Sequence, residues 1–129
     1  MKLSEVMTAL IDKLKTSETS PKMVEPYEGQ FEDVENFIIV PPAIFIDFPS
    51  GGKSGKITNN NGVDVALYIC TQNLHSKSQI STMLDTIETL EKEVLKMKTL
   101  PFYFIQYNGF EKLGNFPGFK FYQMNFRIE

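Results

Sequence analysis

Residues 63–70 read Val-Asp-Val-Ala-Leu-Tyr-Ile-Cys, and this stretch decides the fold class. In a β-strand, every second side chain points to the same face. The first alternating set is wholly aliphatic and consists of Val63, Val65, Leu67 and Ile69. The other set, which includes Tyr68 and Cys70, is not strongly polar. We therefore expect a strand whose first face lies in the core and whose second face is covered as well.

A long helix is predicted to follow this strand, over residues 78–97. Apolar residues recur there at the spacing that places them on one side of a helix. Glu88 and Lys92 add a favourable pair of opposite charges one turn apart, and Pro101 ends the helix. The apolar set is Ile80, Met83, Leu84, Ile87, Leu90, Val94 and Leu95.

The residues before the central strand predict a first helix and a short β region. Apolar residues at helical spacing indicate a helix over residues 4–15. Residues 16–30 begin with a run rich in Ser, Thr and Pro, which predicts a flexible segment. Residues 37–40 and 43–48 flank Pro41-Pro42 and indicate two short strands or one bent edge strand. Residues 49–62, rich in Gly and Asn, predict a long exposed hairpin loop.

The last part of the chain is predicted to form two antiparallel strands, over residues 102–107 and 119–128. Asn108-Gly109 marks either a turn or the start of a loop, because residues 110–118 are too long for a two-residue hairpin. The expected order is α-β-β-β-α-β-β. It corresponds to an α+β fold with an antiparallel (mixed) sheet of four to five strands and two helices packed on one face.

The composition is typical of one intracellular domain that spans residues 1–129. A hydrophobic fraction of 42% and a charged fraction of 22% are ordinary for a globular protein. A net charge of −3 argues against nucleic-acid binding, which needs clustered Lys and Arg. Cys70 is the only Cys, so no internal disulfide is expected. The first six residues lack the apolar run of a signal peptide, and no apolar run is long enough to span a membrane.

No group of residues in the sequence meets the requirements of a catalytic or metal site. Residues 51–54 include the Gly-Lys-Ser of a phosphate-binding loop, but the required first Gly and the following helix are missing. His75 is the only His and has no second His or Cys near it to share a metal. Cys70 is more typical of a buried apolar residue than of a nucleophile. We therefore predict a protein that is not an enzyme and holds no cofactor and no metal.

Two surfaces are candidates for binding other proteins. The final strand is apolar on both faces, so one face is expected to pack on the helices and the other on a partner subunit. An acidic stretch precedes the first predicted strand and indicates either a solvated surface or a docking patch for a basic partner. It contains Glu28, Glu32, Asp33 and Glu35.

Residues 65–74 read Val-Ala-Leu-Tyr-Ile-Cys-Thr-Gln-Asn-Leu, and residues 84–87 read Leu-Asp-Thr-Ile. They resemble the strand, the Thr-x-Asn turn and the Leu-Asp-x-Ile helix of the Mu-like tail terminator family of long-tailed phages. With the element order and the Gly-rich hairpin, the resemblance covers about residues 43–128. It implies a structural protein without catalytic residues. Such a protein forms a hexameric ring on the head-proximal end of the tail tube, stops tube polymerisation and joins the head connector.

The resemblance also implies partners and locations. The partners are further copies of the chain, the tail tube protein and the head–tail connector protein. The charge and the apolar runs of the sequence predict no nucleic-acid partner and no membrane. The locations are the cytoplasm of the host bacterium during assembly and then the virion tail. Candidate contact residues are Lys53, Lys56, Tyr122 and Phe126. An alternative is a small adaptor or regulatory module that binds a protein partner through a sheet edge or the acidic patch. A hydrolase that uses Cys70 or a pair of carboxylates is a further alternative.

Overall fold

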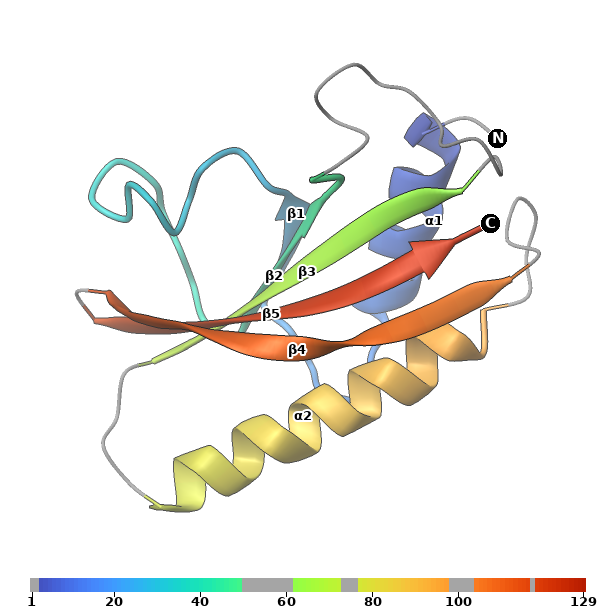
Figure 1. Cartoon of the computed structure of the whole chain (residues 1–129). Helices are drawn as coiled ribbons and strands as arrows, with labels where there is room; N and C mark the ends of the chain where they lie inside the picture. Colours follow the sequence, from blue (N-terminus) through green and yellow to red (C-terminus); the bar gives the residue numbers. More distant parts are fainter. Residues whose placement is uncertain (1–2, 50–61, 73–76, 98–103, 117) are drawn as a thin grey trace.

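The computed structural model describes residues 3–49, 62–72, 77–97, 104–116 and 118–129. In these residues a five-stranded sheet runs in the order β1-β2-β3-β5-β4, with two helices beside it (Figure 1). The helices are α1 (Leu3–Lys15) and α2 (Lys77–Leu95). The predicted α+β class and the order α-β-β-β-α-β-β are confirmed. The strands are β1 (Met23–Pro26), β2 (Ala43–Asp47), β3 (Val63–Gln72), β4 (Ile105–Phe116) and β5 (Phe119–Ile128).

The sheet is mixed because its first strand runs parallel to its neighbour. β1 pairs with β2 in parallel, whereas β2 with β3, β3 with β5 and β4 with β5 pair antiparallel. A parallel pair needs a connection that returns the chain to the level at which the first strand began. Residues 27–42 make that connection. The order of strands leaves β1 and β4 as the two edges of the sheet.

Both helices pack on the same face of the sheet, as predicted. The helical spacing of the apolar residues places one side of each helix in a common core with alternate residues of β3 and β5. Full burial of one such side chain contributes about 1.5–3 kcal/mol, so this cluster is a main source of stability. The helices contribute Val6, Leu10, Leu14, Met83, Ile87, Leu90 and Val94.

The second face of the sheet is covered by the chain itself. Residues 27–39, the light-blue to cyan loop in Figure 1, pack Tyr27, Phe31, Val34 and Ile39 against it. Coverage of the second face of β3 is thereby confirmed. Phe121, on this face of the last strand, is already 0% exposed in the single chain, so it needs no partner subunit to cover it. The buried cluster on this face is Ala43, Phe45, Ala66, Tyr68, Cys70 and Phe121.

Other local predictions are also corrected. The predicted flexible segment, residues 16–30, contains β1, which forms because the edge of β2 is available for pairing. Residues 37–40 form no strand, since they turn Ile39 toward the second-face cluster. β4 continues through residues 108–116, so pairing with β5 replaces the predicted turn and loop. The predicted hairpin loop, residues 49–62, lies outside the described residues except for Pro49 and Gly62.

Candidate interaction surfaces

Cys70, the only candidate nucleophile that the structure describes, is inaccessible. It is 0% exposed within the second-face cluster, as expected for a buried apolar residue. Burial raises the pKa of its thiol from 9.0 to about 12, so the reactive thiolate does not form near neutral pH. Within the described ranges, no three His, Cys, Asp or Glu side chains gather to hold a metal ion. His75 and residues 51–54 lie outside those ranges.

The predicted contact residues divide into two groups. Lys53 and Lys56 lie outside the described residues. Tyr122 and Phe126 face the helices and are 8% and 1% exposed, so neither ring lies on the surface of the single chain. They anchor β4 instead. The ring centroid of Phe126 lies 5.1 Å from that of Tyr107, and the centroid of Tyr122 lies 6.5 Å from that of Phe110.

An open groove of about 460 Å³ separates α2 from the edge strand β4. Two exposed apolar side chains belong to its walls, since Leu84 is 42% and Phe110 is 46% exposed. Glu88 and Glu91 follow Leu84 by one and two helical turns, so all three lie on one stripe of α2. The groove therefore combines apolar walls with two carboxylates. Among the described residues, its lining is Leu84, Ile87, Glu88, Glu91, Tyr107, Gly109 and Phe110.

A bulge in β4 keeps this groove open. The register with β5 shifts between Tyr107 and Phe110, and Gly109 adopts a φ of 100°. A Cβ atom at Gly109 would meet no atom within 4 Å, so no side chain fills the space beside it. The bulge thus supplies a wall of bare backbone between two aromatic rings.

Tyr107 brings a buried polar atom to the groove. Its hydroxyl is inaccessible to water and has no hydrogen-bond partner among the described residues. Burial, with a smaller contribution from the charge of Glu91, raises the pKa of Tyr107. A buried hydroxyl without a partner costs free energy.

The opposite edge of the sheet carries a different surface. Ile38 and Val40 are 86% and 44% exposed. The backbone N–H of Val40 donates to Sδ of Met23 at 3.0 Å, and that of Lys22 donates to the carbonyl oxygen of Pro42 at 2.7 Å. These contacts hold the segment before β2 against β1. Lys22 is exposed, so this edge presents two aliphatic side chains and a cation.

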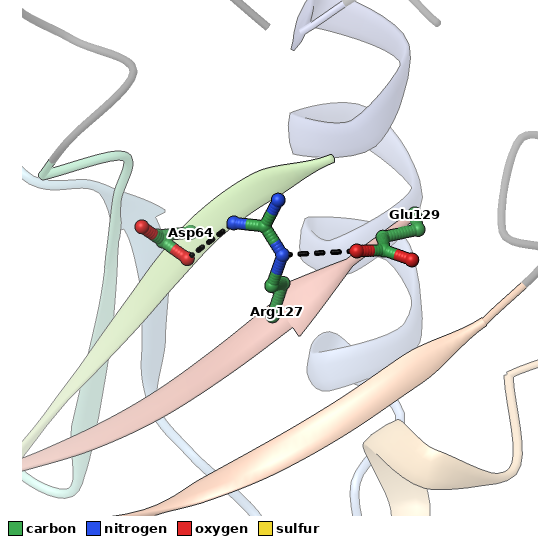
Figure 2. Close-up of polar contacts among 3 residues, drawn as sticks. All are labelled: Asp64, Arg127 and Glu129. Carbon is green, nitrogen blue, oxygen red and sulfur yellow. Dashed lines mark hydrogen bonds and ion pairs between the residues drawn. The ribbon is translucent and has the colours of Figure 1, made fainter. Parts of the chain in front are cut away.

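Asp64, Arg127 and Glu129 form a polar cluster (Figure 2). The Arg127 guanidinium donates to Oδ1 of Asp64 at 3.2 Å and to Oε1 of Glu129 at 3.0 Å. The hydrogen bond with Glu129 contributes most to raising the pKa of Arg127, and the hydrogen bond with Asp64 raises it as well. A Cβ atom at Gly62 would lie 2.8 Å from both Arg127 and Glu129, so glycine leaves room for the cluster. It joins the start of β3 to the end of β5.

The acidic stretch lies on the segment that covers the second face. Glu28, Glu32, Asp33 and Glu35 are exposed, while Phe31 between them packs inward. The side-chain amide of Asn36 donates to both carboxylate oxygens of Asp33, at 2.9 and 2.8 Å. The carboxylates therefore stand on an anchored segment.

Sequence reasoning treats the groove residues Leu84 and Ile87 as core and misses Lys22, Ile38 and Phe110 as surface residues. The sequence gives only a weak signal for such surface residues, because an apolar residue at the edge of a sheet has the same periodicity as one at its centre. No helix in the described residues is long and apolar enough to cross a membrane. Compared with known protein families and with curated proteins, the chain matches no family model and no curated protein.

Proposed function

We propose that the protein is a structural assembly protein of the tail terminator kind, which forms a ring on the end of a phage tail tube. The observation that carries the proposal is the pair of unlike edges on one sheet. β4 and α2 offer an apolar groove with carboxylates, and the segments beside β1 offer two aliphatic side chains and a cation. A contact between two different surfaces of identical subunits is heterologous, and such contacts generate rings when the rotation closes.

The burial of Cys70 argues against an enzyme that uses this thiol as its nucleophile. Catalysis by Cys70 needs an accessible thiolate, and its thiol is buried with a raised pKa. The confirmed order α-β-β-β-α-β-β is also the order implied by the resemblance to tail terminators. In this proposal the ring assembles in the bacterial cytoplasm, stops tube polymerisation, and presents its free side to the head connector.

The test measures assembly directly. Size-exclusion chromatography with light scattering gives the mass of the purified chain, alone and mixed with the tail tube protein of the same phage. Negative-stain images of the mixture then locate the protein on tube ends. We expect rings, alone or on tube ends, and tubes that stop growing once capped. A chain that stays monomeric and never binds tube ends in the mixture rejects the proposal.

A second candidate function is a small adaptor that docks a basic protein partner. The observation in its favour is the exposed acidic stretch on the segment anchored by Phe31. The double variant Asp33→Asn, Glu35→Gln separates the two functions. It abolishes partner binding if the protein is an adaptor, and it leaves ring formation and tube capping intact if the protein is a terminator.

A further inference from the structure

Only the C-terminal end of β1 lies level with the groove across the sheet. The register places Pro26 of β1 opposite Ile46, Ile46 opposite Leu67, Leu67 opposite Met124, and Met124 opposite Phe110 of β4. The same registers connect Met23 to Gly114, so Lys22 and Val40, which lie beside Met23, stand roughly 10 Å or more along the strands from the level of Phe110. A rotation combined with a shift along the strands is needed to bring the β1 edge of one copy to the groove of the next.

The β1 edge and the groove carry opposite charges. Lys22 is exposed and directly precedes β1. Glu88 and Glu91 belong to α2 and line the groove. Glu25 of β1 points to the face opposite to that of Val24. Lys22 is therefore the cation that the β1 edge offers to the two carboxylates.

The contact is made by side chains and does not continue the sheet. β4 has register shifts at two places, between Tyr107 and Phe110 and between Lys112 and Gly114. Bulges twist an edge strand away from further pairing. β1 spans only 4 residues and ends in Pro26, which has no N–H to donate. Neither edge is suited to strand addition, so groove and side chains carry the recognition.

We infer that the α2–β4 groove of one subunit receives the β1 edge of a second copy of this chain, with Ile38 and Val40 against Leu84 and Phe110 and with Lys22 against Glu88 and Glu91. This inference rests on the proposed ring and names the seam that closes it.

The experiment uses two variants of the full chain, Phe110→Asp in the groove and Ile38→Asp at the β1 edge. Each position is exposed, so each variant is expected to fold, which circular dichroism and urea unfolding check. Sedimentation velocity, with tube protein added if the wild type needs it, then measures association. Each variant alone is expected to associate about 30-fold or more weakly, the effect of losing a central contact residue.

Mixing the variants gives the sharpest result. Phe110→Asp retains an intact β1 edge, and Ile38→Asp retains an intact groove, so an equimolar mixture makes one sound seam and stops at a dimer. Absence of that dimer, or growth beyond it, overturns the inference. The control Phe104→Asp removes an apolar side chain that is 56% exposed just before β4, outside the lining of the groove, where its backbone pairs with Glu129. It should assemble like the wild type.

Charge reversal gives an independent arm. Lys22→Glu and the double variant Glu88→Lys, Glu91→Lys should each weaken association, and the chain that carries all three changes should recover part of it. Glu111→Lys, the same change on the other face of β4, is the matched control. If the wild type forms rings and all seam variants do too, the seam is wrong and the proposed function stands. If the wild type never assembles, even with tube protein, both are rejected.

Discussion

Tyr107 and Phe110 lie on the same face of β4 although three positions separate them along the strand. Tyr107 is opposite Phe126 and Phe110 is opposite Met124, and both partners belong to the helix-side core. A regular strand would turn residues with an odd separation to opposite faces. The extra residue at Asn108-Gly109 absorbs the difference, so the bulge sets both aromatic walls of the groove.

The bulge predicts a specific cost for Gly109→Ala. Gly109 has a φ of 100°, which a residue with a Cβ atom adopts only with strain. We expect the free energy of unfolding to fall by about 1–2 kcal/mol, measured by urea denaturation. Gly109→Asn is the matched control and should lose less, because Asn tolerates positive φ better than Ala. Equal losses for the two variants would contradict the backbone explanation.

Phe31 is predicted to hold the cover of the second face in place. Its ring centroid lies 5.0 Å from those of both Tyr27 and Tyr68, and 5.6 Å from that of Phe121. Phe31→Ala should lower the free energy of unfolding by about 3 kcal/mol, since a large aromatic contact is lost. Ile38→Ala, on the same segment but 86% exposed, should change it by less than about 0.5 kcal/mol. A small effect at Phe31 would mean that the segment does not seal this face.

The sequence predicts the elements whose signal is contained within their own residues. α1, β3, α2 and β5 carry apolar residues at helical or alternating spacing, and they form close to their predicted bounds. β1 is missed because Met23–Pro26 is short, half of it is exposed, and it becomes a strand only by pairing with β2. Asn108-Gly109 is a turn signal by itself. Here Tyr107 pairs with Phe126 and Phe110 pairs with Met124 of β5, so the residues on both sides of Asn108-Gly109 stay in one strand.

The candidate site is harder to predict than the fold. Phe31 stands inside an acidic stretch, so its sequence neighbours suggest solvent although it packs against the sheet. Leu84 belongs to the apolar stripe of α2, yet it lies beyond the edge of β4 and stays exposed. Neither fact follows from periodicity, because exposure at a sheet edge depends on where the last strand ends.

Alkaline pH is predicted to destabilise the protein. Burial raises the pKa of Cys70 from 9.0 to about 12. The pKa of Tyr68 rises from 10.0 to about 12, mainly through burial and then through the charge of the neighbouring Asp47. The folded state then keeps protons that the unfolded state releases. Stability is complete below about pH 9 and falls as pH rises toward 12. Between pH 9 and 10, Cys70 alone should remove about 1 kcal/mol.

Urea unfolding at pH 8, 9 and 10 measures this slope. Cys70→Ala removes one of the titrating groups, so its stability should fall less steeply between pH 9 and 10 than that of the wild type, whatever its stability at pH 8. Parallel curves for the two proteins would show that the thiol titrates alike in both states. An exposed Cys70 would be the simplest cause of that result.

Glu93 is predicted to couple the two helices through the turn that ends α1. Its carboxylate accepts hydrogen bonds from the hydroxyl of Ser17 and from the backbone N–H of Glu18, the latter at 3.0 Å. Ser17 is 8% exposed, so its hydroxyl loses this partner with little access to water. Glu93→Ala should lower the free energy of unfolding by about 2 kcal/mol, a typical value for hydrogen bonds to a charged group.

Glu88→Ala is the control for Glu93→Ala, because it removes a carboxylate from an exposed position of the same helix. Its free energy of unfolding should stay within about 0.5 kcal/mol of the wild-type value. In assembly the order of the effects is reversed. Glu88→Ala should weaken association and Glu93→Ala should not, since Glu88 lines the groove and Glu93 does not. A large loss of stability in Glu88→Ala would place that carboxylate in the fold itself and remove it from the proposed seam.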